Sequence, residues 1–355
     1  MTVHVALDAM GGDRGPNELS LGALQAVAVS DLEVTLIGDE NQINAVLKDQ
    51  KWQGDRIHVV HTSEVVSMHE SPFEAVRKKK NASIVIAFDL LKNKKVDAVV
   101  SAGNSGATMA AAIKYLGRLK NISRPGIASI FPTLKGPVVV MDVGANVDCR
   151  PQHLFEFGAM AAAFSKGVLG IKKPRIGLLS IGEEGGKGNA LVKEAHKLFT
   201  DSAFNFIGNV EGRDTFQGDV DVIVCDGFVG NVCLKLSEGL AEAVLSMLRD
   251  EISKGFMSKI GYLLAKKAFI NFKKRVDYAE YGGAPLLGLN GVGIVCHGRS
   301  NAKAIKNAIF VAAELVQNKV NDIILSNLSE TEMLDEPKSP TEQPPAESKS
   351  VGGAQ

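Results

Sequence analysis

Short apolar stretches of strand length recur along the chain, and longer helix-like segments separate them. Their apolarity is continuous rather than alternating, which is typical of parallel strands covered by helices on both faces. The pattern therefore predicts an α/β fold with three α/β/α layers around a mostly parallel sheet. The expected strands are Val3–Leu7, Val34–Ile37, Ile57–Val60, Ala98–Val100, Val138–Met141, Ile176–Ser180, Val222–Cys225 and Val292–Cys296.

Several of these expected strands run directly into turns that are rich in Gly, Asn and Asp. Because the carboxyl ends of parallel strands share one edge of a sheet, we expect these turns to gather there. Helix N-termini and loop amides at such an edge bind anions. The turns are Asp8–Asp13, Ser101–Gly106, Asp142–Asn146, Gly182–Asn189 and Asp226–Asn231.

The composition narrows the class of protein. Lys and Arg total 40 and so do Asp and Glu, so the basic excess typical of nucleic-acid binders is absent. The four cysteines form no C-x-x-C pair, which favours a reducing compartment. The N-terminus has no signal-peptide pattern, and no run of about 18 apolar residues occurs. We therefore expect a soluble, cytoplasmic protein that binds no nucleic acid.

Nucleotide and metal motifs fail when they are compared letter by letter. The segment from Gly182 to Lys187 is too short for a P-loop, and Gly188 follows it where Ser or Thr would be required. The dinucleotide fingerprint is incomplete as well. His58 and His61 have H-x-x-H spacing but no third ligand at metal spacing, so we interpret them as structural. The sequence predicts neither a cofactor nor a metal.

The glycine-rich loop Gly182–Asn189 contains one lysine, Lys187, which can neutralise phosphate as a point charge. A flexible surface turn is the alternative. Asn231 can donate to a developing oxyanion or cap a helix. In the turn Ser101–Gly106, Asn104 can cap the next helix while backbone amides face an anion, or the turn can be a helix cap only. His297 follows an expected strand and can serve as an acid–base group or as part of a turn.

The segment from Ile252 to Val276 contains seven basic residues and no acidic one. Its apolar residues fall on one helical face, which favours an interfacial segment that contacts anionic headgroups. Gly255 and Gly261 favour two short helices, and residues 252–276 are expected to form an amphipathic insertion. A helical hairpin at a dimer interface, or a dock for an acidic partner, is the alternative. The expected membrane contacts are Phe256, Met257, Ile260, Leu263, Leu264, Lys266 and Lys267.

The C-terminal segment, Ser329–Gln355, is rich in Pro, Ser, Glu and Gly and has few large apolar residues. Such a segment buries too little apolar surface to offset the entropy of ordering. We expect a single catalytic domain over residues 1–328 and a disordered tail over residues 329–355.

Taken together, these motifs resemble the bacterial phosphate acyltransferases of phospholipid synthesis, over roughly Val3 to Val320. The motifs are Asp8–Asp13, Ser101–Ala107, Asp142–Cys149, Gly182–Asn189, Phe228–Asn231 and Tyr281–Gly288. The resemblance implies transfer of a fatty-acyl group from acyl carrier protein to inorganic phosphate. The acyl phosphate formed would supply a membrane glycerol-3-phosphate acyltransferase.

The resemblance also implies a homodimer at the inner face of the cell membrane. It implies a Rossmann-like α/β/α fold related to phosphate acetyltransferases and isocitrate dehydrogenases. Carried over by motif, the catalytic pair is Lys187 and Asn231. The expected phosphate- and substrate-binding residues are Asp8, Gly11, Gly12, Gly103, Asn104, Ser105, Gly106, Asn146, Glu183, Gly186, Asn189 and His297.

The expected mechanism is direct attack of phosphate on the thioester, held by Lys187 and by amides of Gly103–Gly106 and Gly185–Gly188. Cys225 and Cys233 are interpreted as inert thiols, so no acyl-enzyme is expected. Three alternatives remain open. They are a short-chain phosphate acyltransferase that uses coenzyme A, a non-catalytic membrane scaffold, and a decarboxylating dehydrogenase on the related fold.

Overall fold

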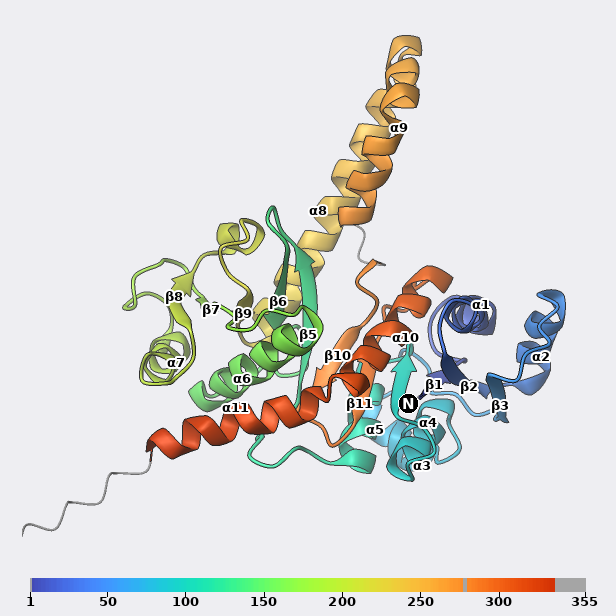
Figure 1. The fold of residues 1–355 in the computed structure, drawn as a ribbon, viewed down its shortest axis with the longest axis horizontal. Helices are drawn as coiled ribbons and strands as arrows, with labels where there is room; N and C mark the ends of the chain where they lie inside the picture. The colour runs from blue at the N-terminus through green and yellow to red at the C-terminus, as the bar shows by residue number, and fades with distance from the viewer. Residues whose placement is uncertain (1, 277–279, 336–355) are drawn as a thin grey trace, which may run out of the picture.

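A computed structural model describes residues 2–276 and 280–335 of the chain, and its strands form one sheet (Figure 1). The eleven strands lie in the order β3-β2-β1-β4-β11-β10-β5-β6-β9-β7-β8. They are β1 (Val3–Asp8), β2 (Leu32–Gly38), β3 (Ile57–His61), β4 (Ala98–Ser101), β5 (Gly126–Pro132), β6 (Pro137–Met141), β7 (Ile176–Leu179), β8 (Phe206–Val210), β9 (Val222–Val224), β10 (Ala284–Leu287) and β11 (Val292–Val295).

Helices cover both faces of the sheet. They are α1 (Gly15–Val27), α2 (Glu40–Asp49), α3 (Pro72–Lys78), α4 (Ser83–Lys92), α5 (Ser105–Leu116), α6 (Pro151–Val168), α7 (Ala190–Thr200), α8 (Gly227–Lys254), α9 (Phe256–Val276), α10 (Ala302–Gln317) and α11 (Val320–Asp335), with a short 3-10 helix at Gly212–Phe216. Helices α1, α6, α7 and α10 pack on one face in a single large core. Helices α4 and α5 cover the opposite face of the N-terminal half, and α8 begins on that face in the other half. The expected three-layer α/β/α fold is confirmed.

All the expected strands occur, but β5, β8 and β10 were not anticipated. Polar residues, Gly or Pro interrupt these segments, as in Gly126–Pro132, so they do not read as continuous apolar runs. Two of the three matter for the topology. Strand β10 is antiparallel to both β11 and β5, and β6 is antiparallel to β5.

These antiparallel pairs reverse the direction of the sheet between its two halves. Strands β1, β4 and β11 are parallel to one another, whereas β6, β9 and β7 run in the opposite direction. The carboxyl ends of the two groups therefore lie at opposite edges. We call the edge where β1, β4 and β11 end the first edge, and the edge where β6, β9 and β7 end the second edge. The expectation that all the turns share one edge is wrong.

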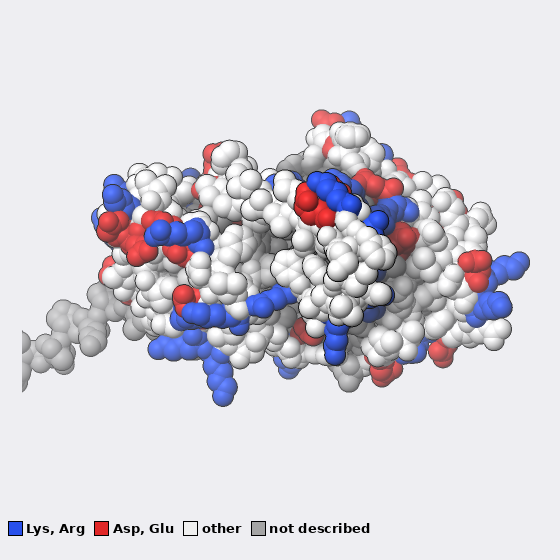
Figure 2. All heavy atoms as spheres, turned by 90° about the horizontal axis from the view of Figure 1, so that it is seen from above, with Lys and Arg blue, Asp and Glu red and all other residues white. Residues whose placement is uncertain are grey.

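The basic segment is part of a long helical hairpin that projects away from the sheet (Figure 1). Residues 252–254 end α8, Gly255 is the break, and α9 continues as one helix through Gly261. The expectation of two short helices within residues 252–276 is thus corrected, because Gly255 lies at the turn and Gly261 does not interrupt α9. Seen from above, the end of the hairpin carries uncharged side chains beside charged ones of both signs (Figure 2).

The C-terminal helix, α11, continues to Asp335, so residues 329–335 are helical rather than part of the expected tail. Residues 336–355 lie outside the described part of the chain. Among the described helices, none combines the length and the apolar content required to cross a membrane.

Candidate active site

At the first edge, a buried carboxylate joins the loops that follow β1 and β4. The Asp8 carboxylate accepts a hydrogen bond from Ser101 Oγ at 2.8 Å, and Ser101 Oγ accepts one from the Gly103 amide at 3.1 Å. The two loops approach closely at Gly11, because a Cβ at Gly11 would lie 2.6 Å from the backbone nitrogen of Gly103. Burial raises the pKa of Asp8, and the hydrogen bonds oppose that rise. Asp8 therefore organises the loops.

The loop after β11 completes the first edge. The Asp13 amide donates to the Gly298 carbonyl at 2.7 Å, and Gly12, with φ +84°, lies beside that carbonyl. A side chain at Gly12 would therefore be strained and would collide with the backbone. His297 next to Gly298 is exposed, and its Nδ1 accepts a hydrogen bond from the Arg299 amide at 3.1 Å.

Asn104 caps α5 and uses its whole amide within the fold. Its Oδ1 accepts from the Ala107 amide at 3.0 Å, and its Nδ2 lies within 3.2–3.4 Å of the carbonyl oxygens of Ser67, Met68 and Glu70. These contacts support the cap interpretation. Ser105 and Gly106 form the first turn of α5, where Pro72 packs against Gly106.

At the second edge, the Asp142 carboxylate holds the loop after β6. It accepts hydrogen bonds from the amides of Ile127, Ala145 and Asn146 at 2.6–3.2 Å and from Asn146 Nδ2 at 3.0 Å. The carboxylate is fully buried, and this burial raises the pKa of Asp142. The sequence signal was its place directly after an apolar run, which Asp8 shares, but Asp142 was not among the expected site residues.

Asn146 connects this loop to the start of α8. Its Nδ2 also donates to the Pro125 carbonyl at 2.9 Å, and its own carbonyl accepts from the Gly227 amide at 2.7 Å. A Cβ at Gly230 would lie 1.9 Å from the Asp142 carbonyl oxygen, so α8 can approach only with glycine there. Asn146 is buried and acts within the framework, although it was expected to bind substrate.

Asn231 lies beyond this anchored first turn of α8. Asp226 is the N-cap, because its carboxylate accepts from the Val229 amide at 2.9 Å, so capping does not account for Asn231. The Asn231 side chain is exposed and approaches Gly144, whose ideal Cβ position is 3.5 Å from Asn231 Cγ. Within the described residues, its amide has no hydrogen-bond partner.

The glycine-rich loop after β7 carries Lys187. The loop folds back, so that a Cβ at Gly182 would lie 3.0 Å from Lys187 Cγ. The Lys187 ammonium is exposed and makes no hydrogen bond or ion pair to any described residue, whereas its backbone amide donates to the Glu184 carbonyl at 2.9 Å. Apart from Gly186 and its two chain neighbours, no described atom lies within 4 Å of the ideal Cβ position of Gly186, so the space beside it is open.

Two other expected residues of this loop already have partners. Glu183 forms a 3.6 Å ion pair with Arg213, but both side chains are about two-thirds exposed, so the pair adds little stability. Asn189 caps α7 by accepting from the Val192 amide at 2.9 Å. This leaves Lys187 as the cationic group of the loop that is available to an anion.

The connections at the second edge leave the sheet on opposite faces. Strands β6 and β7 lie on either side of β9. They lead to α6 and α7 on one face, whereas β9 leads to α8 on the other. Such a switch point leaves a crevice outside the strand ends, which is where ligands bind in open α/β sheets. Asn231 and the Lys187 loop follow the neighbouring strands β9 and β7.

The cysteines offer no activated nucleophile. Burial raises the pKa of Cys149 to about 11 and that of Cys296 to about 12, and it also raises the pKa values of Cys225 and Cys233. A thiol with such a pKa carries little thiolate near neutral pH. The interpretation of Cys225 and Cys233 as inert is consistent with this environment.

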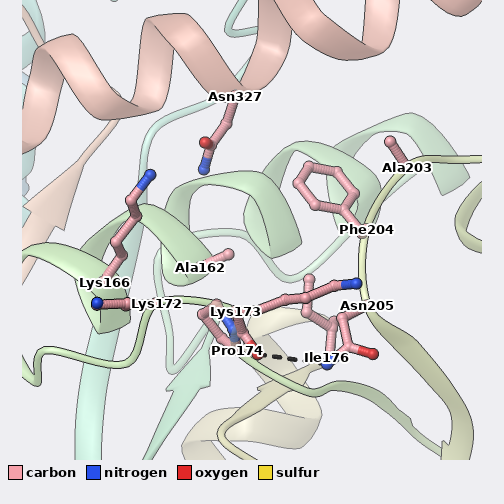
Figure 3. Close-up of a pocket in the computed structure, with 10 residues that line it drawn as sticks. All are labelled: Ala162, Lys166, Lys172, Lys173, Pro174, Ile176, Ala203, Phe204, Asn205 and Asn327. Carbon is pink, nitrogen blue, oxygen red and sulfur yellow. Dashed lines mark hydrogen bonds between the residues drawn. The ribbon is translucent and has the colours of Figure 1, made fainter.

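A separate hollow lies at the opposite end of β7 from Lys187 (Figure 3). Lys166 of α6, Lys172 and Lys173 before β7, and Asn327 of α11 line it. Asn205 also lines it and donates to the Lys173 carbonyl at 3.3 Å. None of the expected site residues contributes to this hollow.

Comparison with known proteins adds independent findings. Residues 3–323 match the family model described as a fatty acid synthesis protein. The chain is 58% identical over 328 residues to a protein named phosphate acyltransferase from Geotalea uraniireducens, covering 92% of this chain and 95% of the relative. It is 55% identical over 330 residues to one of the same name from Geobacter sulfurreducens, covering 93% and 95%.

Solved structures confirm the fold class. A phosphotransacetylase from Streptococcus pyogenes superposes with a TM-score of 0.61 at 17% identity, covering 89% of this chain and 94% of that one. A 4-hydroxythreonine-4-phosphate dehydrogenase from Klebsiella pneumoniae gives 0.53 at 14% identity, with coverage of 89% and 98%. At these identities the likeness concerns the fold alone.

Proposed function

Because this chain belongs to the phosphate acyltransferase family of fatty acid and phospholipid synthesis, we propose that its reaction takes place at the second edge, with Lys187 and Asn231 in the active site. The activity implies an acyl-carrier thioester and inorganic phosphate as substrates. The observation that carries the proposal is a pair of exposed polar groups with no side-chain partner among the described residues, Lys187 on the loop after β7 and Asn231 near the start of α8, which follows the neighbouring strand β9.

In the proposed reaction, a phosphate oxygen attacks the thioester carbonyl carbon. A carbon–oxygen bond forms, the carbon–sulfur bond breaks, and the carrier leaves as a thiolate that takes up a proton from solvent. Phosphate is already a nucleophilic anion near neutral pH, so the protein has to position it and stabilise the tetrahedral oxyanion. Lys187 neutralises phosphate, and the Asn231 amide donates to the oxyanion.

The division between the two edges limits which amides can share one phosphate. In a single chain, Gly185–Gly188 lie at the second edge, whereas Gly103–Gly106 lie at the first. We therefore assign the phosphate of the reaction to the Lys187 loop. The first-edge residues Asp8, Gly11, Gly12, Gly103 and Asn104 serve to hold the loops of their own half.

Substitution of Lys187 tests this assignment. Lys187→Ala should lower kcat/KM for phosphate at least about tenfold, because a hydrogen bond to a charged group contributes about 1.5–3 kcal/mol. Lys193→Ala is the matched control, since Lys193 is exposed on the helix that follows the same loop. The readout is release of carrier thiol that depends on phosphate. Equal activity of the two folded variants would remove Lys187 from the mechanism.

The acyl donor is tested separately. Palmitoyl carrier protein and palmitoyl or acetyl coenzyme A are each supplied with phosphate, and acyl phosphate is measured. We expect the carrier thioester to be used with the higher kcat/KM. Preference for a coenzyme A thioester would favour the short-chain alternative. Vesicle binding without any thioester cleavage would favour the scaffold, and reduction of a nicotinamide would favour the dehydrogenase.

We also propose that the end of the α8–α9 hairpin contacts the inner face of the cell membrane. Phe256, Met257 and Leu264 are 76–84% exposed there, and Leu263 is 67% exposed. Lys266 and Lys267 follow on the same helix and can meet anionic headgroups. This location would bring the acyl phosphate to the membrane glycerol-3-phosphate acyltransferase.

A second apolar surface on the hairpin supports the expected homodimer. Val232, Leu236, Leu240, Val244 and Met247 are 47–70% exposed and recur every three or four residues along α8, which places them on one face. A second copy of this helix would cover that face. Light scattering of wild type and of Leu240→Glu should show a dimer and a monomer, respectively.

The membrane contact is tested with vesicles that contain anionic phospholipid. Leu264→Glu should reduce co-sedimentation, because it puts a carboxylate into the expected apolar contact. Leu198→Glu, at an exposed position of α7, should bind as wild type does. Unchanged binding of Leu264→Glu would contradict the proposed contact.

A further inference from the structure

Three side chains with metal-binding atoms meet on one face of the N-terminal half of the sheet, apart from the loops described at the first and second edges. His4 comes from β1, Glu33 from β2 and His58 from β3, which are neighbouring parallel strands. One ligand atom of each residue lies within 4.8 Å of the corresponding atoms of the other two. Nothing in the phosphate acyltransfer mechanism uses this group.

The strand register explains why they meet. His4 is directly opposite Glu33, and His58 is directly opposite Thr35, which is two residues from Glu33 on β2. Side chains at directly paired positions, and at alternate positions along a strand, share one face of a sheet. His61 is three residues from His58, so it points to the opposite face. His58 and His61 therefore do not share a site despite their H-x-x-H spacing. The residues that meet are His4, Glu33 and His58, which are far apart in the sequence.

The three ligand atoms are close enough together to approach a single ion. His58 Nε2 is 3.2 Å and His4 Nδ1 is 3.8 Å from the same Glu33 oxygen, Oε2. Ligands bound to zinc at about 2.0–2.1 Å in a tetrahedral arrangement lie about 3.3 Å from one another. The Glu33–His58 separation is already near that value, and the other two separations are longer but within 4.8 Å.

The surroundings of His4 are those of a metal ligand. Its second ring nitrogen, Nε2, lies 2.7 Å from the hydroxyl of buried Thr35, which fixes the ring with Nδ1 toward Glu33. Metal-bound histidines commonly have such a partner on the other nitrogen. Asp97, whose carboxylate accepts from the His4 amide at 2.9 Å, adds negative charge nearby.

We propose that His4, Glu33 and His58 form a binding site for a divalent transition-metal ion, with zinc as the ion that fits the donor set. Two imidazoles and one carboxylate are a recurring zinc ligand set, and water would complete the tetrahedron. The side chains of His4, Glu33 and His58 are 24%, 40% and 46% exposed, so an ion can reach them from solvent. A bound ion would join three strands that the unfolded chain does not hold together.

The test is titration of the whole protein, first stripped with a chelator, with Zn²⁺ in a calorimeter. Wild type should bind one ion at this site, and His58→Ala should bind it at least about 100-fold more weakly, because one of three ligands is lost. Thr35→Val should weaken binding about 10–100-fold through the lost support of His4. His61→Ala is the matched control on the same strand and should bind as wild type does.

Two further readouts separate this site from adventitious binding. Zn²⁺ should raise the Tm of wild type and of His61→Ala but not that of His58→Ala, because only the folded state presents the three ligands together. The Co²⁺-loaded protein should show tetrahedral absorption without a thiolate charge-transfer band. Equal Zn²⁺ affinity of wild type and His58→Ala, or a thiolate band, would overturn the proposal, as would no binding by wild type.

Discussion

At the first edge of the sheet, Asp8 and Asn104 use their polar atoms to hold the fold, whereas at the second edge Lys187 and Asn231 have no side-chain hydrogen bond or ion pair within the described part of the chain. Both edges have a buried aspartate directly after a strand, Asp8 in one case and Asp142 in the other. The difference lies in the asparagines. Asn104 uses both ends of its amide within the fold, whereas the Asn231 amide has no partner among the described residues. Residues of the same type in similar loops can thus hold a fold at one edge and be available to a substrate at the other.

The largest expected effect distinguishes the two asparagines. Asn231→Ala should lower turnover by about two to three orders of magnitude, the usual effect of removing one oxyanion donor, with little change in Tm. Asn104→Ala should instead destabilise the protein by about 1 kcal/mol, the usual effect of losing a helix cap, and leave the folded enzyme nearly fully active. Steady-state kinetics and thermal unfolding of both variants check this. If Asn231→Ala lost stability and Asn104→Ala lost turnover, the comparison between the two edges would be wrong.

The two buried aspartates should differ in how much stability they provide. Asp142→Ala takes the acceptor from three backbone amides, whereas Asp8→Ala takes it from two, those of Met10 and Gly11, and from the hydroxyls of Ser83 and Ser101, which can rotate to another acceptor. Because each unsatisfied buried group costs about 1–3 kcal/mol, we expect a loss of at least about 3 kcal/mol for Asp142→Ala and less for Asp8→Ala. Urea unfolding of both variants measures the difference.

The pH dependence of the free energy of unfolding tests how the charge of Asp142 affects stability. Burial raises its pKa above the ordinary value of 3.8, so the folded state keeps the proton over a pH range in which the unfolded state has lost it. The free energy of unfolding of wild type relative to Asp142→Asn should therefore fall as pH rises from 3.8 through the raised pKa. Urea unfolding of both proteins across that range tests this. A parallel pH dependence would show that the charge of Asp142 does not affect stability.

The smallest expected effect concerns the thiol beside the second edge. Cys149→Ser should leave turnover within about twofold of wild type, because the raised pKa of this thiol, about 11, disfavours an acyl-cysteine intermediate. Burst kinetics with carrier protein that bears a radiolabelled acyl group provide the check. Direct attack by phosphate leaves no labelled enzyme. Labelled wild type and inactive Cys149→Ser together would require a covalent mechanism.

The hydrophobic pattern was sufficient to identify the layers and most of the strands. Continuous apolar runs such as Ala98–Val100 and Val138–Met141 are buried on both faces, and this requirement can be read from sequence. Their positions also located the turns that carry the candidate site residues, because a turn that follows a buried strand must lie at a sheet edge. The motifs within those turns pointed to the phosphate acyltransferase family, which the relatives confirm.

Only the tertiary structure decided which turns share an edge. Strands β5 and β10 contain Pro and short or interrupted apolar runs, and their antiparallel pairing reverses the sheet. Burial on both faces gives a strand a continuous apolar pattern, but that pattern does not say which way its neighbour runs, so the direction of each strand cannot be read from local sequence. For the same reason, the meeting of His4, Glu33 and His58 depends on register between strands that are far apart in the chain.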